Sequence, residues 1–217
     1  VPESGPLALA PDSVATWPHC GPVVVATRGP DALYVTLRET PTLIDGGHNL
    51  AGEPRAVVEF DTAAADVVQL PLAIADELTI RGAWCRCVQI VGAFDAAAQL
   101  TVAHTETRVQ FGRPIGSFQA IQHRMADLLT EVEQARSAVW NLAGNLGTPD
   151  RDRHVAATKS LVGRVSLYVA EETIQLHGGI GMTEEYAVGH YLRRIHVLDQ
   201  MFGDADAHAA RLAAALL

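Results

Sequence analysis

The chain has 217 residues, of which 48% are hydrophobic and 19% charged, a composition typical of a folded globular protein. The formal net charge of −9 weighs against nucleic-acid binding, which requires a dense basic surface. No apolar run approaches the roughly 20 residues that cross a bilayer, so we expect no membrane-spanning segment.

The first 74 residues are predicted to form a partial β domain. Short runs rich in β-branched residues at 22–27, 32–37 and 55–61 are separated by turns that contain glycine, proline and aspartate. Several short strands with turns between them indicate a small antiparallel sheet or part of a barrel. No constellation of catalytic residues is visible in this segment.

Residues 75–217 are predicted to form a helical bundle, with a first helix that begins near Leu78 and reaches Arg108. Thr148 and Pro149 are expected to open a third long helix as its N-cap and first residue. Apolar stripes at helical spacing support the first two helices: Ala83, Cys87, Ile90, Val91, Phe94 and Ala98, then Ile121, Met125, Leu128, Val132, Ala135, Val139 and Leu142.

A third stripe runs to Leu176, and two shorter helices are expected at residues 184–198 and 205–217. The predicted fold class is therefore α+β, mainly α, with a C-terminal four-helix bundle preceded by a small antiparallel β domain. Trp84 and Trp140 are expected in the core or at an interface.

The three cysteines, Cys20, Cys85 and Cys87, do not form a disulfide framework, because their spacing is neither the redox nor the usual zinc spacing. We interpret all three as small buried thiols in a reducing cytoplasm. The nine histidines show no pair at metal-ligand spacing with a suitable partner, so no metal site is predicted.

The junction between the first two helices, residues 108–123, reads Arg-Val-Gln-Phe-Gly-Arg-Pro-Ile-Gly-Ser-Phe-Gln-Ala-Ile-Gln-His. Gly112, Pro114 and Gly116 are expected to end one helix, and the Ser117 side chain to cap the next. A plain helical hairpin needs only a glycine and a cap. The additional arginines, aromatics and amides therefore indicate a binding surface.

A second unusual stretch, residues 175–186, reads Gln-Leu-His-Gly-Gly-Ile-Gly-Met-Thr-Glu-Glu-Tyr. On its own it is explained by a helix terminator and a capped turn, with Glu184 and Glu185 in the first turn of the next helix. It follows a helix, so it is not a dinucleotide-binding fingerprint. Paired glycines also let backbone N–H groups approach phosphate oxygens. His177 either approaches such a ligand or complements the helix dipole, and we favour the second role.

Together the two motifs resemble those of the acyl-CoA dehydrogenase family, in which an N-terminal helical domain, a middle β domain and a C-terminal bundle hold FAD. The resemblance covers residues 78–203 and has no counterpart of the N-terminal domain. It implies that the motifs reach across a subunit interface to the partner's FAD. By position, it assigns Arg108 to the pyrophosphate, Gln110 and Phe111 to the adenosine side, Gln119 to the adenine, and Gln175, Gly178 and Gly179 to the pyrophosphate and ribose.

The resemblance also shows what is missing. Family members carry the base that removes the α-proton as a glutamate in a Tyr-Glu-Gly triplet, and the corresponding residue here is Phe202. Other members place it on the first bundle helix, where residues 81–86 contain no carboxylate, and the CoA contacts fall near Ile80 and Ala83. Asp199 and Asp204 are the fallback candidates for a displaced base.

Where the family has a Thr-x-Gln sequence that contacts FAD, this chain has Asp204 and Asp206, whose carboxylates would repel a pyrophosphate. The resemblance therefore implies a non-catalytic subunit of a heterotetramer with two copies of each chain (α₂β₂), as in bacterial sterol catabolism. The partner would hold most of the acyl-CoA and supply the glutamate, and electron-transfer flavoprotein would accept the electrons. Two alternatives remain: a homo-oligomeric dehydrogenase with a displaced carboxylate, and a helical scaffold with a degenerate flavin site.

Overall fold

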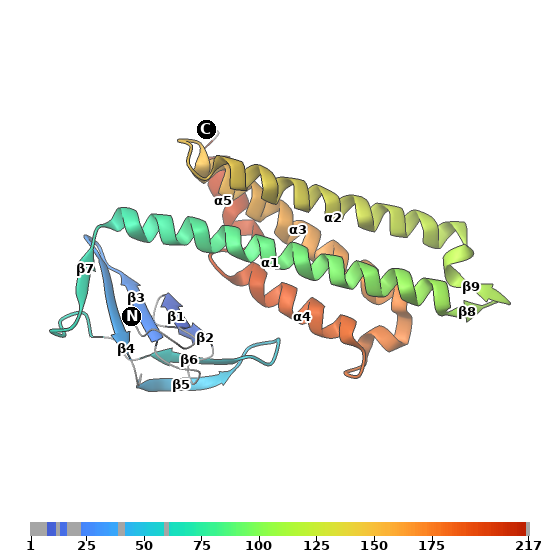
Figure 1. Ribbon diagram of the computed structural model, residues 1–217, viewed down its shortest axis with the longest axis horizontal. Helices are drawn as coiled ribbons and strands as arrows, with labels where there is room; N and C mark the ends of the chain where they lie inside the picture. Colours follow the sequence, from blue (N-terminus) through green and yellow to red (C-terminus); the bar gives the residue numbers. More distant parts are fainter. Residues whose placement is uncertain (1–7, 12–13, 17–22, 39–41, 59–60, 216–217) are drawn as a thin grey trace. The chain divides into compact units, whose positions relative to one another are not determined.

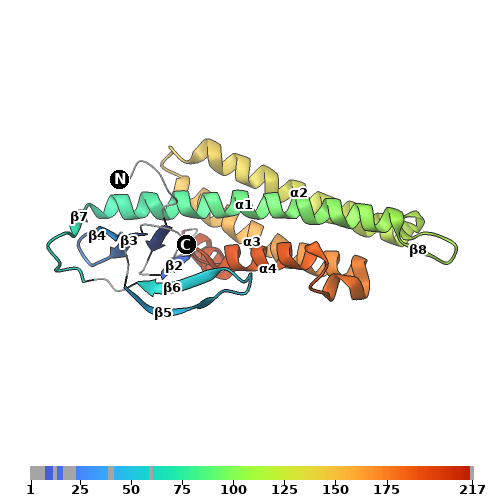
Figure 2. The ribbon, with the colours of Figure 1, turned by 60° about the horizontal axis from the view of Figure 1, so that its bottom comes forward.

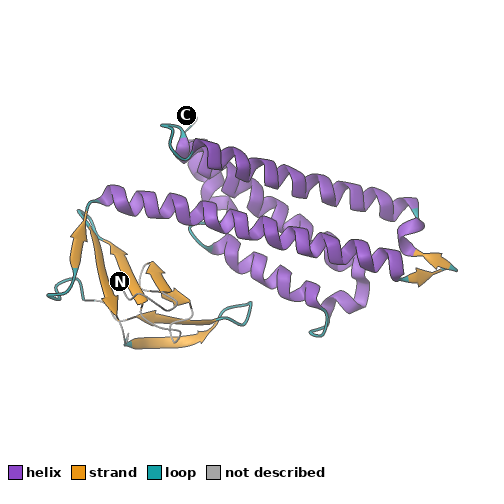
Figure 3. Cartoon of the chain, in the orientation of Figure 1, coloured by secondary structure: helices purple, strands orange, loops and turns teal. Residues whose placement is uncertain are grey.

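The computed structural model describes residues 8–11, 14–16, 23–38, 42–58 and 61–215. The chain divides into two compact units, Val1–Thr79 and Ile80–Leu217, and the division falls inside the first helix. Strands make up the first unit and long helices the second, as Figure 3 shows. The predicted fold class, α+β and mainly α, is confirmed.

The first unit contains two small sheets. Their strands are β1 (Ala8–Pro11), β2 (Val14–Thr16), β3 (Val23–Arg28), β4 (Leu33–Arg38), β5 (Leu43–His48), β6 (Pro54–Val58) and β7 (Val68–Leu70). One sheet has the order β1-β3-β4-β7 and the other β2-β6-β5. All pairs are antiparallel except β1 with β3, which is parallel. The runs predicted from sequence correspond to β3, β4 and β6, and the other strands were not predicted.

The second unit is built from long helices (Figure 1), and the first four of them contribute buried apolar residues to one core. They are α1 (Leu72–Thr107), α2 (Gln119–Asn145), α3 (Arg151–His177), α4 (Ala187–Gln200) and α5 (Ala205–Ala214). The predicted stripe residues of α1 are all buried, and in α2 all are buried except Ile121, which is half-buried. Figures 1 and 2 show α1 and α2 lying side by side, joined at one end by a hairpin.

Helix α1 starts at Leu72, before the predicted start at Leu78. The reason is that its first turns contact a different core: Ala75 packs with Ala26 and Leu33 of the β unit, so they do not continue the bundle stripe. Helix α1 is long, but no helix in the described part of the chain is long and apolar enough to cross a membrane.

Three predicted helix starts were wrong because the side chains bond elsewhere. The Ser117 hydroxyl donates to the Pro114 carbonyl at 2.7 Å, and α2 begins after Phe118 without a side-chain cap. The Thr148 hydroxyl donates to the Asn145 carbonyl at 2.9 Å and closes α2, so α3 begins two residues beyond Pro149. Glu184 lies before the first residue of α4.

Candidate functional site

The Arg-x-Gln-Phe-Gly sequence forms a β-hairpin at the end of α1. Strand β8 (Val109–Gln110) pairs antiparallel with β9 (Arg113–Pro114) and leaves two residues at the turn. These residues, Phe111 and Gly112, have φ values of 54° and 80°, as a type I′ turn requires. Glycine adopts such values readily, whereas a left-handed phenylalanine costs roughly 1–2 kcal/mol. The turn thus keeps a strained Phe111 at the hairpin tip, where it is 94% exposed.

An open cavity of about 570 Å³ lies where the ends of α1 and α3 meet the hairpin and the start of α2. Six of the seven residues predicted to bind the cofactor line it: Arg108, Gln110, Phe111, Gln175, Gly178 and Gly179. The seventh, Gln119, is the exposed first residue of α2 and is not among the lining residues. The fold therefore brings the two sequence motifs together around one cavity.

Arg108 supplies a positive charge that has no partner among the described residues. Its backbone is fixed, because its N–H donates to the His104 carbonyl at 2.9 Å and its carbonyl accepts from the Ile115 N–H at 2.8 Å. In the same cavity Arg124 is already engaged and donates to the Glu172 carboxylate at 2.7 Å. An exposed guanidinium with unused donors at a cavity is suited to a phosphate group.

The paired glycines leave the backbone at the end of α3 open. Gly178 has a φ of 64°, and its N–H donates to the Ile174 carbonyl. A Cβ added at Gly178 or Gly179 would meet no atom within 4 Å. At Gly181, in contrast, a Cβ would lie 2.9 Å from the His177 Cβ, so packing requires that glycine. The first two glycines therefore present accessible backbone to a ligand, and the third serves the fold.

Two stacked histidines form one wall of this cavity. The His104 and His177 rings lie 4.6 Å apart at 29°, and Tyr186 packs against His177 at 4.9 Å. The His177 Nδ1 lies 2.8 Å from the Thr173 carbonyl, which only accepts, so Nδ1 donates and the side chain bonds within its own helix. Burial lowers the pKa of His104, and His177 and Arg108 lower it further. These effects favour the neutral form of His104 in this wall.

The lining fits a dinucleotide cofactor such as FAD. Arg108 offers a fixed cation, Gln175 an amide that both donates and accepts, and Phe111 an exposed ring. The glycine backbone leaves room for close approach. Ligand sites commonly combine apolar walls with a few convergent polar groups in this way.

The two segments where a base is expected, Phe202 and residues 81–86, contact each other at Gly82. A Cβ built on Gly82 of α1 would lie 2.4 Å from the nearest atom of the Phe202 ring. This ring packs on an apolar cluster that contains Ile80, Ala83 and Leu142, so the expected CoA positions are core residues. Phe202 itself has a φ of 61°, and its carbonyl accepts from the His208 Nε2 at 2.9 Å. An aromatic ring on a glycine therefore occupies the space where a carboxylate is expected.

Both fallback carboxylates have other roles in the structure. Asp199 is buried beside the fully buried Lys159: the Nζ lies 3.7 Å from Oδ1 and donates to the Asp199 backbone carbonyl at 2.7 Å. Burial raises the pKa of Asp199, and the ammonium of Lys159 opposes this rise. Asp204 caps α5 by accepting from the Ala207 N–H at 2.8 Å. Neither carboxylate lines the cavity that contains Arg108.

The remaining polar residues also differ from expectation. Cys87 is buried, and burial raises the pKa of its thiol to about 12, but Cys85 is exposed, so its predicted burial was wrong. Helix α1 turns the two side chains to different faces because they are two residues apart. Cys20 lies outside the described residues. Glu184 bonds Arg193 through both oxygens, at 2.8 and 2.9 Å. Among the described residues there is no cluster of three or more potential metal ligands.

Comparison with known proteins shows which family carries this arrangement. Residues 73–217 match the family model "Acyl-CoA dehydrogenase, C-terminal domain". The acyl-CoA dehydrogenase IpdE2 of Mycobacterium tuberculosis is 36% identical over 197 residues, which are 88% of this chain and 56% of the relative. The chain thus spans about half the length of the curated relatives it matches.

Solved structures show the same fold. The ChsE4–ChsE5 complex of Mycobacterium tuberculosis superposes with a TM-score of 0.81 at 22% identity, over 99% of this chain and 63% of that chain. The steroid ACAD Tcur3481–Tcur3483 gives a TM-score of 0.79 at 24% identity, over 97% and 62%. Homologues and solved structures of the matched family are FAD-dependent flavoproteins, which confirms the expected cofactor for the family.

Proposed function

This chain belongs to the acyl-CoA dehydrogenase family, and we propose that it contributes one end of an FAD site to a partner chain that carries the catalytic glutamate. One observation carries the proposal. Arg108, Gln175 and the open glycines surround one cavity, while Phe202, one expected base position, packs on Gly82 within the other expected segment, residues 81–86. In this proposal the chain has the residues that bind FAD but not the carboxylate that removes the α-proton.

We assign each lining residue a task at this site. The Arg108 guanidinium pairs with the pyrophosphate through its unused donors, and the Gln175 amide bonds the pyrophosphate and ribose. The backbone at Gly178 and Gly179 allows close approach of phosphate oxygens. Gln110 and Phe111 line the adenosine side, where binding removes the exposed Phe111 ring from water. Gln119, outside the cavity lining, would reach the adenine from the start of α2.

The proposed reaction is α,β-dehydrogenation of an acyl-CoA thioester. FAD, when bound, accepts the hydride that leaves the β-carbon. The partner's glutamate takes the α-proton, and the product is the trans-2-enoyl-CoA. Because a steroid enzyme is among the structural relatives, we propose a sterol-derived acyl group. Two-chain complexes among them support a heteromer, proposed as α₂β₂, with electron-transfer flavoprotein as acceptor.

The test is co-expression with an acyl-CoA dehydrogenase encoded beside this gene, followed by flavin spectroscopy of the purified complex. Arg108→Ala is expected to weaken FAD binding about 10- to 150-fold, since hydrogen bonds to charged groups are worth roughly 1.5–3 kcal/mol. The control is Arg164→Ala, an exposed arginine on α3 outside the cavity. Unchanged FAD occupancy in Arg108→Ala would show the assignment to be wrong.

The alternatives give different results. A homo-oligomeric dehydrogenase with a displaced base requires flavin and activity in this chain alone, and that outcome would refute the partner-supplied glutamate. The roles of Asp199 and Asp204 in the structure argue against it. A helical scaffold requires that no pairing of chains binds flavin.

A further inference from the structure

His104 lies next to Arg108 in the cofactor cavity, and none of the proposed FAD contacts uses it. The Arg108 N–H donates to the His104 carbonyl at 2.9 Å, so Arg108 continues the helical turn at the end of α1. Residues four apart on a helix share one face, with roughly 5–6 Å between their Cβ atoms. Both residues line the cavity of about 570 Å³. The His104 imidazole is therefore within reach of a group that the Arg108 guanidinium binds.

The His104 ring is oriented by its neighbours without a hydrogen bond. It stacks on His177 with 4.6 Å between the ring centroids, and it meets the Tyr186 ring edge-on at 6.3 Å. Within the described part of the chain neither ring nitrogen of His104 has a hydrogen-bond partner, whereas His177 Nδ1 donates to the Thr173 carbonyl. The His104 side chain is partly exposed. It therefore presents an oriented imidazole whose nitrogens remain available to a ligand.

The surroundings of His104 favour its neutral form in the absence of an anion. Burial lowers its pKa, and His177 on α3 and Arg108 on α1 lower it further. Tyr186 also faces the ring, and no carboxylate is among the described residues that line the cavity. A phosphate group at Arg108 would compensate the guanidinium charge and favour the imidazolium form. Phosphate binding and proton binding are then linked at His104.

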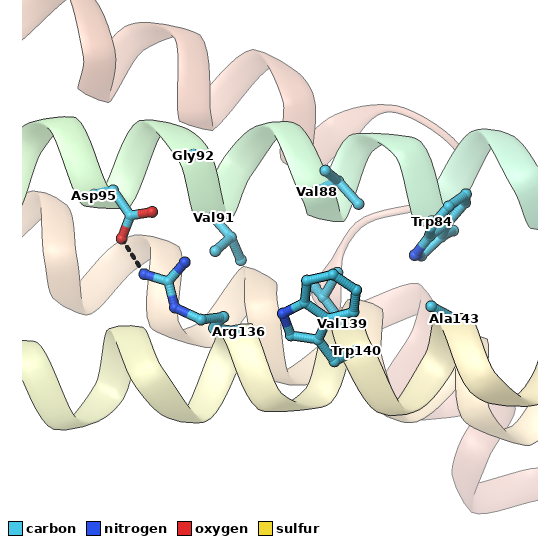
Figure 4. A pocket seen from close by; sticks show the side chains of 9 residues that line it. All are labelled: Trp84, Val88, Val91, Gly92, Asp95, Arg136, Val139, Trp140 and Ala143. Carbon is cyan, nitrogen blue, oxygen red and sulfur yellow. Dashed lines mark hydrogen bonds and ion pairs between the residues drawn. The ribbon is translucent and has the colours of Figure 1, made fainter.

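The hollow between α1 and α2, of about 320 Å³, shows the contrast. Its charged residues, Asp95 and Arg136, form an ion pair with each other, which Figure 4 draws as a dashed line. An anion there would have to displace a carboxylate from the arginine. Of these two hollows, only the one at Arg108 places a guanidinium with unused donors beside an unbonded imidazole.

We propose that His104 binds the FAD pyrophosphate together with Arg108, and that its imidazole takes up a proton from solvent as the phosphate oxygens arrive. The protonated ring then donates a charge-assisted hydrogen bond to a phosphate oxygen. The inference rests on the proposed function, because it concerns the same FAD site. His104 is a binding residue there and has no part in the removal of the α-proton. Since binding takes up a proton, FAD should bind more tightly as the pH falls.

The test is calorimetric titration of FAD into the flavin-depleted complex with the catalytic partner, from about pH 6 to 8. Two buffers of different ionisation enthalpy give the number of protons taken up. The unmodified complex is expected to take up a proton and to bind FAD about 10- to 100-fold more tightly at the lower pH, since each unit of pKa shift is a factor of ten. His104→Phe keeps a ring that can stack on His177 but cannot be protonated, so this uptake and this pH dependence should disappear.

A second variant separates the hydrogen bond from the proton. The amide of His104→Gln can still donate to a phosphate oxygen, so FAD binding near pH 8 should stay within a few-fold of the unmodified complex while the pH dependence is lost. The matched control is His154→Phe, near the start of α3 and outside the cavity lining, which should leave both unchanged.

The outcomes distinguish this inference from the proposed function. Unchanged proton uptake in His104→Phe would refute the role of His104, while loss of FAD binding in Arg108→Ala would still support the site. FAD binding that is equal in all variants, Arg108→Ala included, would refute both. A complex that binds no FAD at any pH would also refute both.

Discussion

A methyl group added at Gly82 tests the contact between this glycine and the Phe202 ring. In Gly82→Ala the new Cβ would lie 2.4–2.8 Å from three atoms of the Phe202 ring, closer than any stable carbon contact. Overpacking of this kind costs roughly 1–3 kcal/mol. The gain in helix propensity from glycine to alanine returns only about 0.5–1 kcal/mol. We therefore expect a net loss of up to about 2.5 kcal/mol in the free energy of unfolding.

The effect of Gly82→Ala on the free energy of unfolding should change sign when the Phe202 ring is removed. In a Phe202→Ala background the methyl group no longer meets the ring, so Gly82→Ala should stabilise the chain by roughly 0.5–1 kcal/mol. The four proteins form a double-mutant cycle, measured by urea denaturation with circular dichroism, and the coupling should be about 1–3 kcal/mol. Gly144→Ala on α2, where a Cβ has no neighbour within 4 Å, is the control and should not couple. If Gly82→Ala stabilises the chain with Phe202 present, the ring does not lie on Gly82 and the reasoning fails.

Two further predictions concern buried titratable groups. In a Cys20→Ser background, a thiol reagent should label Cys85 rapidly and Cys87 only after unfolding, because Cys87 is buried and its thiol has a pKa of about 12. Labelling is measured by mass spectrometry, and two labels on the folded chain would contradict this prediction. Burial lowers the pKa of His208 below its ordinary 6.5 in the folded state. Near that pH the unfolded state therefore binds more protons than the folded state, and the free energy of unfolding should fall as the pH drops below 6.5. His208→Gln should weaken that dependence in urea titrations between about pH 5 and 7, and an unchanged slope would exclude His208 as its source.

The bundle was predictable because burial repeats with the helical period. The spacing of Cys87, Ile90 and Phe94 places them on one face of α1, and all three are in the core. The same period gave no signal for the first turns of α1, since Ala75 contacts the β unit. Hydrophobic periodicity in the sequence therefore identifies a helix face only where that face contacts the same core along its whole length.

The helix starts were not predictable, because a hydroxyl has several bonding choices of similar energy. Ser117 and Thr148 are good N-caps by type, yet each bonds a carbonyl three residues earlier. The hairpin was missed for a related reason: Phe111 is an unusual residue for a left-handed turn position, and Gly112, together with Pro114 and Gly116, was interpreted as a helix stop.

The lack of a carboxylate at Phe202 and in residues 81–86 was visible in the sequence, but the contact between these segments required the structure. In the sequence, the lack of a carboxylate at Phe202 and the lack of one in residues 81–86 are two separate observations. In the structure the two segments form one contact, so the positions depend on each other. A single Phe202→Glu substitution would place a carboxylate against the apolar side chains of Ile80 and Ala83. Burial there would raise the pKa of the new group and destabilise the fold. A glutamate at Gly82 would collide with the ring. If a partner supplies the base as proposed, neither change alone would make this chain independent of that partner.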